Sequence, residues 1–306
     1  MSVQFRQVAY KLPWGAMRGL SVGNPDSKNV YVCLHGWQDN CGLFKPLLSK
    51  LPQDNHYIAL DLVGHGLSDR LPAGGMYQFN MYPLALTHIL ESLELAKVNL
   101  IGHSLGGGVC GMYTALFPEK VERLILLDSA GMPLIRDDFK GHTKKAFLDT
   151  VGYKEKEEFQ NTKEELFRRL DVGMKRLGSG LTNEAKELWL ERAATKLVNA
   201  KYQLNRDRRL ALATPGVMSI DQMKDLHTSI LDSDVKVLGL MQAKKESNKM
   251  DGAEFFKSAT GQATKEFFKK LAAKEENGLS FLEGNHHFFV NDPDVAAEHI
   301  CDFITR

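Results

Sequence analysis

The sequence predicts an α/β fold in which helices cover both faces of a mostly parallel sheet. Three observations support this. Short apolar runs alternate with helical segments through the first 130 residues. The runs are almost wholly apolar, as expected for parallel strands buried on both faces. Each run ends at glycine or a polar residue, and such repeated alternation is typical of strands joined by crossover helices.

The first third of the chain can be divided into elements from these patterns. Strands are expected at residues 3–10, 16–22, 29–34, 56–60, 98–101 and 121–127. Helices are expected at residues 41–50, 79–96 and 105–117. Pro13-Trp14-Gly15 supplies a turn between the first two strands, and Pro52 and Pro118 follow the ends of two helices.

The pattern changes after about residue 131. From there to about residue 230 the chain is charged and helical in periodicity, with no strong strand run, and it is too long for a loop. We expect residues 131–230 to form an inserted helical cap whose apolar residues, such as Phe139, Phe147 and Phe159, pack in its own core. Residues 1–130 and 231–306 would form the main domain. In its second part strands are expected at 235–241 and 279–282, and helices at 262–275 and 293–304.

Composition narrows the class of function. The 39 Lys and Arg residues nearly balance the 38 Asp and Glu residues, so no overall charge favours nucleic acid or an anionic membrane. No apolar run is long enough for a membrane span, and the first residues lack the apolar stretch of a secretory signal. The four cysteines form no Cys-x-x-Cys pair, and no local His or Glu spacing suggests a metal site. These features predict a cytoplasmic protein without metal or cofactor, and they leave its oligomeric state open.

The strongest local motif is Gly102-His103-Ser104-Leu105-Gly106, which fits Gly-x-Ser-x-Gly. It lies between a predicted strand and a predicted helix, the setting in which this motif forms a sharp turn that exposes a nucleophilic serine. The glycines permit the tight turn, and the following helix presents its N–H groups to developing negative charge. Ser104 is therefore the expected nucleophile.

A serine hydroxyl needs a base, and His286 is the best candidate. It lies in the loop after the last predicted strand, so it follows the nucleophile and the acid in chain order, as this fold requires. The adjacent His287 is the alternative. His35, His65 and His103 lie near the ends of predicted strands and are expected to be scaffold or pocket-lining residues.

An oxyanion formed during attack on a carbonyl needs two N–H donors. The backbone N–H of Leu105, directly after the nucleophile, is one candidate. The second is the backbone N–H of Trp37, in the loop after the strand at 29–34, where Gly36 lets the chain approach closely.

The acid that orients the histidine is less well defined. The loop after the strand at 235–241 has no Asp where one is expected; Glu246 is the nearest acid, and Asp251 lies further on. Asp128 directly follows the apolar strand at 121–127, and a charge at such a place usually has a partner. We favour Asp128 and retain Glu246 and Asp251 as alternatives.

Several strings extend these observations beyond the single motif. They are Leu34-His35-Gly36-Trp37-Gln38-Asp39-Asn40, Asp61 through Ser68, Gly102 through Gly107, Leu126-Leu127-Asp128, and Leu204-Asn205-Arg206-Asp207-Arg208-Arg209-Leu210. Together they resemble the α/β-hydrolase superfamily and, within it, the serine hydrolase-like (kraken-type) proteins of animals. Gly284-Asn285-His286 before Pro293 is similar to the family's Gly-x-His…Pro pattern, which selects His286 over His287.

The resemblance implies an eight-stranded sheet, a helical cap between strands six and seven, and a Ser-His-acid site beneath the cap. Members of the superfamily include esterases, lipases, thioesterases and C–C bond hydrolases. Relatives with dehalogenase or epoxide-hydrolase activity use an Asp nucleophile, whereas this chain has Ser104. Some relatives place the acid after strand six, which corresponds to Asp128 here.

The sequence thus predicts a serine hydrolase that cleaves a small or medium apolar carboxylic ester or thioester through an acyl-enzyme. Two alternatives remain: a non-catalytic ligand-binding or signalling protein on the same fold, and a C–C bond hydrolase. Arg206 and Arg208 are expected to pair with Asp207 or a neighbour rather than to bind a substrate carboxylate.

Overall fold

The computed structural model describes residues 3–132, 138–154, 159–176, 178–212, 218–243 and 258–306. Its centre is an eight-stranded sheet in the order β1-β2-β4-β3-β5-β6-β10-β11. The strands are β1 (Arg6–Leu12), β2 (Gly15–Gly23), β3 (Val30–Leu34), β4 (His56–Leu60), β5 (Val98–His103), β6 (Val121–Leu127), β10 (Lys236–Ala243) and β11 (Gly278–Glu283). Only β2 runs antiparallel to its neighbours in this sheet. The mostly parallel eight-stranded sheet is therefore confirmed.

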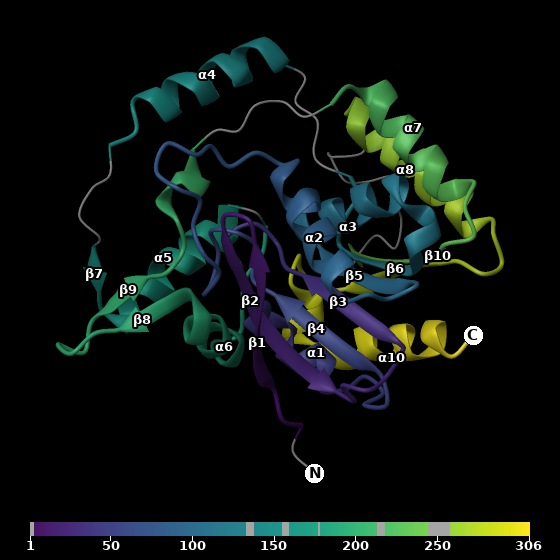
Figure 1. The fold of residues 1–306 in the computed structure, drawn as a ribbon, viewed down its shortest axis with the longest axis horizontal. Helices are drawn as coiled ribbons and strands as arrows, with labels where there is room; N and C mark the ends of the chain where they lie inside the picture. The colour runs from purple at the N-terminus through teal and green to yellow at the C-terminus, as the bar shows by residue number, and fades with distance from the viewer. Residues whose placement is uncertain (1–2, 133–137, 155–158, 177, 213–217, 244–257) are drawn as a thin grey trace.

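Helices cover both faces of the sheet (Figure 1). One face carries α2 (Met81–Ser92), α3 (Leu105–Leu116), α7 (Ile220–Leu231) and α8 (Ala259–Ala272). The other carries η1 (Cys41–Phe44), α1 (Lys45–Leu48), α9 (Phe288–Asn291) and α10 (Pro293–Ile304). All five residues of β3 are buried: Val32 and Leu34 belong to one hydrophobic core, and Tyr31 and Cys33 to the other. Burial on both faces explains why the strand sequences are almost continuously apolar.

The segment between β6 and β10 is not all-helical. It contains α4 (Phe139–Val151), α5 (Lys163–Arg176), α6 (Asn183–Ala193) and η3 (Arg208–Ala211). It also contains a small antiparallel sheet in the order β7-β9-β8, formed by β7 (Gln160–Asn161), β8 (Ala194–Lys196) and β9 (Tyr202–Leu204). Strands of two or three residues are too short to show a period-2 pattern, so no sequence pattern indicates them.

Helix α7 also departs from the expected division of the chain. All but its last residue lies inside the segment expected to form the cap, yet the helix packs against α3 and α8. Its buried Met223 and Ile230 belong to the hydrophobic core on that face of the sheet. A helix has the same amphipathic pattern whether it packs within the cap or against the main sheet. Periodicity therefore does not show to which of the two α7 belongs.

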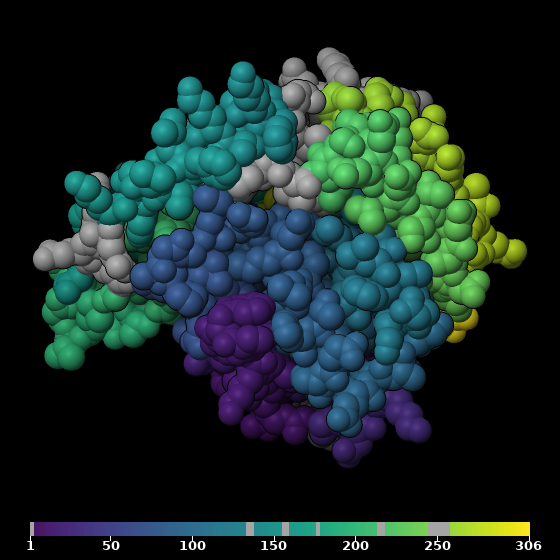
Figure 2. Space-filling model, turned by 45° about the horizontal axis from the view of Figure 1, so that its top comes forward, coloured from purple at the N-terminus to yellow at the C-terminus, as the bar shows by residue number. Residues whose placement is uncertain are grey.

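Helix α4 lies along the outer surface, shown in teal in Figure 2. Its side chains Phe139 and Phe147 are 59% and 54% exposed, and Phe159 just beyond it is 64% exposed. The expectation that these aromatic residues form the core of the cap is therefore wrong. No helix in the ranges that the structure describes is both long and apolar enough to cross a membrane.

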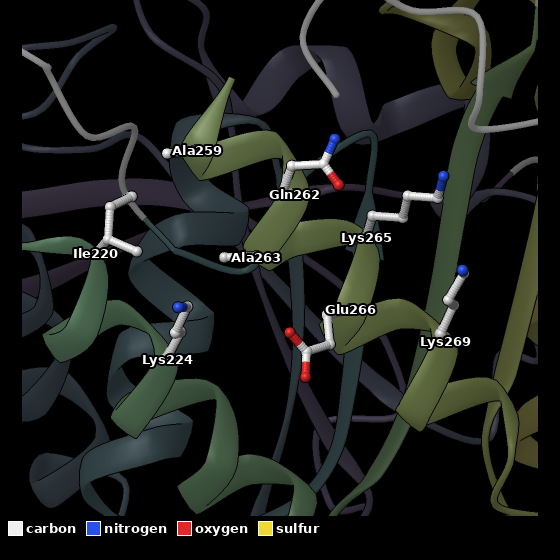
Figure 3. Close-up of a pocket in the computed structure, with 8 residues that line it drawn as sticks. All are labelled: Ile220, Lys224, Ala259, Gln262, Ala263, Lys265, Glu266 and Lys269. Carbon is white, nitrogen blue, oxygen red and sulfur yellow. The ribbon is translucent and has the colours of Figure 1, made fainter. Parts of the chain in front are cut away.

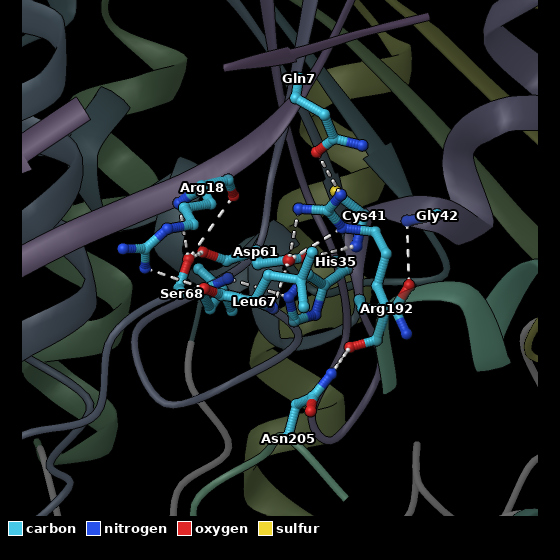
Figure 4. A network of polar contacts seen from close by, with 12 residues as sticks. Gln7, Arg18, His35, Cys41, Gly42, Asp61, Leu67, Ser68, Arg192 and Asn205 are labelled. Atoms are coloured by element: carbon cyan, nitrogen blue, oxygen red, sulfur yellow. Dashed lines mark hydrogen bonds and ion pairs between the residues drawn. The ribbon is translucent and has the colours of Figure 1, made fainter. Parts of the chain in front are cut away.

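A buried ion pair joins α6 of the inserted segment to the main domain (Figure 4). Arg192 donates from Nε to Asp61 Oδ2 at 2.9 Å, and both side chains are almost completely buried. Asp61 also accepts hydrogen bonds from the backbone N–H groups of Cys41 and Leu67, and Arg192 donates to Gln7 Oε1. Because the carboxylate is surrounded by donors, the charge is stable in the interior, and α6 is fixed above the ends of β3 and β4.

Candidate active site

Ser104 occupies a sharp turn between β5 and α3. Its backbone has φ 51° and ψ −114°, a conformation that a residue with a side chain adopts only when its surroundings impose it. The turn is held by a hydrogen bond from the Ser104 N–H to the carbonyl of Leu127 on β6. A Cβ at Gly106 would lie 2.1 Å from the carbonyl oxygen of Leu34, so this approach of α3 to β3 requires glycine. This is the geometry of a nucleophile elbow.

His286 follows β11 and is held by Asp128, the residue after β6. His286 Nδ1 lies 2.5 Å from Asp128 Oδ2, and the other carboxylate oxygen accepts from the Gln242 N–H at 3.0 Å. Burial lowers the pKa of His286, but the hydrogen bond and charge of Asp128 outweigh it, so the pKa is raised above 6.5. The imidazole is therefore oriented with Nε2 directed away from the acid. The alternatives Glu246 and Asp251 lie outside the described residues.

His286 contacts His103, the residue directly before Ser104 in the elbow. The two imidazole rings have centroids 4.6 Å apart, and His103 Nε2 donates to the backbone carbonyl of His286 at 2.9 Å. No hydrogen bond joins the Ser104 hydroxyl to His286 among the contacts of the described chain. Hydrogen bonds between a nucleophile and its base are often long before substrate binds. The pairing of Ser104 with His286 therefore stays a prediction.

The two expected oxyanion donors lie on adjoining loops. Leu105 begins α3, and Trp37 follows β3; the Gly106 N–H joins the two loops by donating to the carbonyl of His35. Within the described parts of the chain, neither the Trp37 N–H nor the Leu105 N–H donates a backbone hydrogen bond. The Trp37 indole is 47% exposed and donates to the carbonyl of Leu210 on η3. Neither amide is therefore engaged by a backbone acceptor, and their role as oxyanion donors stays a prediction.

His287 has partners quite different from those of His286. Its Nε2 lies 3.0 Å from Asp39 Oδ2, and its Nδ1 lies 2.7 Å from Ser179 Oγ. His103 Nδ1 lies 3.5 Å from the same Asp39 oxygen. Burial raises the pKa of Asp39, but His287 and His103 more than offset it, so the pKa is held well below its usual range. Burial lowers the pKa of His103 to about 4. No local spacing reveals this cluster, because Asp39 and His287 are 248 residues apart.

His35 and His65 serve the scaffold, as expected. His35 Nε2 accepts from the Leu62 N–H at 2.9 Å, and His65 Nδ1 bonds to the carbonyl of Val63. Burial lowers the pKa of His65 to about 3, so its ring is neutral. Among the described residues, neither ring forms a hydrogen bond with His286 or Asp128.

Arg206 is arranged differently from the expectation. Asp207 pairs with Arg209, at 2.7 Å, and not with Arg206 or Arg208. Arg206 instead donates to Gln38 Oε1, in the loop that carries Trp37. Burial and the nearby charge of Arg169 lower the pKa of Arg206 to about 10. In the part of the chain that the structure describes, Arg206 forms no ion pair, so a cation adjoins the expected oxyanion loop.

A separate groove lies between α7 and α8 (Figure 3). Its polar side chains are the amines of Lys224, Lys265 and Lys269, together with Gln262 and Glu266. It contains neither a nucleophile nor a histidine, and none of the Ser104, His286 or Asp128 side chains lines it. The candidate site is therefore the one at the ends of β5, β6 and β11.

Comparisons with known proteins agree with the fold. The family model described as the alpha/beta hydrolase fold matches residues 29–269. The chain is 33% identical over 301 residues to a serine hydrolase-like protein of Danio rerio, covering 96% of this chain and 86% of that protein. It is 30% identical over 305 residues to serine hydrolase-like protein 2 of Homo sapiens, covering 96% and 92%.

Two solved structures illustrate the similarity in fold. The hypothetical protein PA1622 from Pseudomonas aeruginosa PAO1 has a TM-score of 0.79 at 25% identity, with both chains fully covered. The thioesterase domain from the curacin biosynthetic pathway has a TM-score of 0.76 at 17% identity, covering 97% of this chain and 99% of that one. With its elbow, its sheet order and these matches, the chain belongs to the α/β hydrolase family.

Proposed function

We propose that this protein is a serine hydrolase that cleaves carboxylic esters or thioesters through an acyl-enzyme. The observation that carries the proposal is the strained Ser104 at the strand–helix turn, beside a histidine that an aspartate orients. A side chain held in so unfavourable a backbone conformation needs a reason, and exposing a nucleophile is the usual one. The relatives named serine hydrolase-like support the hydrolytic class but not a substrate.

The proposed reaction has two halves. His286 Nε2 accepts the proton of Ser104 Oγ as this oxygen bonds to the acyl carbon, and the carbonyl oxygen becomes an oxyanion that the Trp37 and Leu105 N–H groups stabilise. The C–O or C–S bond to the leaving group then breaks, and that group leaves with the proton from His286. Water, deprotonated by the same histidine, attacks the acyl-enzyme and releases the acid and free Ser104. Asp128 keeps Nδ1 protonated throughout and stabilises the imidazolium.

Labelling with a fluorophosphonate tests this proposal directly. Intact mass should show one adduct on wild type and none on Ser104→Ala, with Ser92→Ala, an exposed serine at the end of α2, labelled like wild type. The His286→Gln variant should be labelled far more slowly. If folded wild type forms no adduct, or if Ser104→Ala is labelled as fast, the proposed hydrolase is refuted and a ligand-binding role becomes the better account.

Arg206 bears on the substrate class. A partly buried guanidinium beside the Trp37 loop, with the charge of Arg169 nearby and no ion pair in the described residues, favours an anionic group on the substrate. We therefore propose an acyl group that is apolar along its length and carries a carboxylate at its end. A plain apolar ester remains the alternative.

The comparison of two p-nitrophenyl esters tests this refinement. Replacing Arg206 by Gln should lower kcat/KM for an ester with a terminal carboxylate about tenfold to a hundredfold, because a hydrogen bond to a charged group is lost. The matched neutral ester should change less than threefold, and Arg208→Gln serves as the control. Equal losses for both esters would show that Arg206 supports the loop through Gln38 rather than the substrate.

A further inference from the structure

A second cluster of titratable side chains lies next to the proposed catalytic histidine. It consists of Asp39, His103 and His287, which are 5%, 1% and 2% exposed. The potential ligand atoms of the three residues all lie within 4.8 Å of one another. The mechanism proposed above uses none of these three side chains as acid, base or nucleophile, so their convergence in the interior needs another explanation.

In each of the two imidazole rings, the nitrogen that faces away from Asp39 already has a hydrogen-bond partner. His103 Nε2 lies 2.9 Å from the carbonyl oxygen of His286, and because a carbonyl only accepts, this nitrogen carries the proton. His287 Nδ1 lies 2.7 Å from Ser179 Oγ, in the loop that Asn285 and Asn291 hold through the carbonyl of Gly180. Histidines that bind metals are oriented in this way, with the non-ligating nitrogen fixed by a second hydrogen bond.

Among the residues that the structure describes, the other ring nitrogen of His103, Nδ1, has no hydrogen-bond partner. In a neutral ring that carries its proton on Nε2, Nδ1 presents a lone pair, and here it points towards Asp39 Oδ2 at 3.5 Å. Two lone pairs facing each other in a buried site repel, and the nitrogen is left without a donor at a cost in stability. A cation between the two atoms would remove both penalties.

Gly36 keeps room beside these atoms. A Cβ at this position would lie 2.8 Å from Asp39 Oδ2 and 2.9 Å from His103 Nδ1. The space next to the carboxylate and the imidazole is therefore space that only glycine leaves open. Asp39 Oδ2 and His103 Nδ1 thus lie against the backbone of Gly36 rather than against a side chain.

We propose that Asp39 Oδ2, His103 Nδ1 and His287 Nε2 bind a divalent transition metal ion of the Zn²⁺ and Cu²⁺ class. Two imidazoles and one carboxylate are a ligand set that these ions favour, whereas Ca²⁺ and Mg²⁺ require more oxygen ligands. Bonds of 2.0–2.1 Å in a tetrahedral centre place neighbouring donors about 3.3 Å apart. The distances from Asp39 Oδ2 to His287 Nε2 and to His103 Nδ1, 3.0 and 3.5 Å, bracket that value.

The ion would inhibit the proposed reaction. The His103 ring lies against the His286 ring, with centroids 4.6 Å apart, and donates to the backbone of His286. An ion held on the far nitrogen of His103 fixes this ring and, through its hydrogen bond, the backbone of His286. His286 can then no longer shift towards Ser104 when substrate binds. This consequence rests on the proposed function, whereas binding of the metal does not.

Calorimetric titration of the full chain with ZnCl₂, after removal of metals with a chelator, tests the site. Wild type should bind one ion per chain, and His287→Gln and Asp39→Asn should each weaken binding at least a hundredfold. His142→Gln, on the outlying helix α4, is the matched control and should bind like wild type. With Cu²⁺, electron paramagnetic resonance should show coupling to two imidazole nitrogens.

Two further measurements cover variants that fail to fold and separate this inference from the proposed function. Ser179→Ala changes only the group that orients His287, and it should weaken Zn²⁺ binding about tenfold while the protein stays folded. Absence of binding to wild type, equal affinity in the ligand variants and wild type, or a Cu²⁺ spectrum without nitrogen coupling would each overturn the site.

The effect of the metal ion on the proposed reaction is tested separately. Zn²⁺ should slow fluorophosphonate labelling of Ser104 at least tenfold. An unchanged rate with bound Zn²⁺ would refute the inhibition alone, and absence of labelling in metal-free protein would refute the hydrolase but leave the titration decisive.

Discussion

His286 and His287 are neighbours in sequence, and each is bonded to an aspartate, yet their surroundings differ. The His286 side chain is 19% exposed and approaches Asp128 through Nδ1. The His287 side chain is 2% exposed, approaches Asp39 through Nε2 and uses its other nitrogen on Ser179. His286 therefore keeps one nitrogen free of its acid for chemistry, whereas His287 has both nitrogens engaged. A histidine–aspartate pair acts as a base only when the second nitrogen remains accessible.

The largest expected effect is the loss of activity when the aspartate that holds His286 is replaced. Changing Asp128 to Asn should lower kcat/KM for a p-nitrophenyl ester about 10³–10⁴-fold, because the imidazole loses both its orientation and the charge that stabilises its protonated form. The thermal midpoint should change little. The control is Glu246→Gln, which replaces the other candidate acid. If Glu246→Gln abolishes activity and Asp128→Asn does not, the assignment of the acid to Asp128 is wrong.

A second effect separates the two histidines by stability. His287→Gln should lower the free energy of unfolding by about 3–5 kcal/mol, since Asp39 is left as a buried charge without its closest donor. His286→Gln should lower it by less than about 1 kcal/mol, because that ring is partly exposed and Asp128 still accepts from the Gln242 N–H. Urea unfolding of both variants in chelator-treated protein measures the difference. Equal losses would mean that the two pairs contribute alike to the fold.

The smallest effect is a shift in pH dependence. Neutral His286 is the active base, so kcat/KM should fall as the pH drops through its pKa, which the hydrogen bond and charge of Asp128 raise above 6.5. In metal-free Asp128→Asn the midpoint of the residual activity should move to lower pH, because the largest raising influence is removed. Burial lowers the pKa of His286 and the more distant charge of Asp39 raises it less than Asp128 does, so Asp39→Asn should move the midpoint less. A midpoint that Asp128→Asn leaves in place would show that another group limits the rate.

Much of the fold followed from the sequence because the relevant patterns are local. The strands at His56–Leu60 and Val121–Leu127 coincide with their expected limits, since each is an apolar run that ends at an aspartate. The turn at Ser104 was evident from its glycines and its place between a strand and a helix. Asp128 and His286 were candidates because parallel strands bring their carboxyl ends to one edge of the sheet.

Other features required the tertiary structure. Helix α7 and the exposed aromatic residues of α4 were misplaced, because amphipathic periodicity shows that a helix has an apolar face but not which surface covers it. The Arg192–Asp61 pair joins residues 131 positions apart, and neither residue carries a local signal of the other. The sequence also does not show that Asp207 pairs with Arg209 or that Arg206 donates to Gln38, which is 168 residues away.

The sequence by itself determined most strands and helices of the main domain, the mostly parallel sheet with helices on both faces, and the candidates for nucleophile, base and acid. All of these depend on residues close together in the chain or on the topology that the elements impose. Only the tertiary structure decided that His286 meets Asp128 while His287 meets Asp39 and lies beside His103. That choice depends on where three separate loops converge above the sheet, and side-chain contacts between distant segments leave no periodic trace in the sequence.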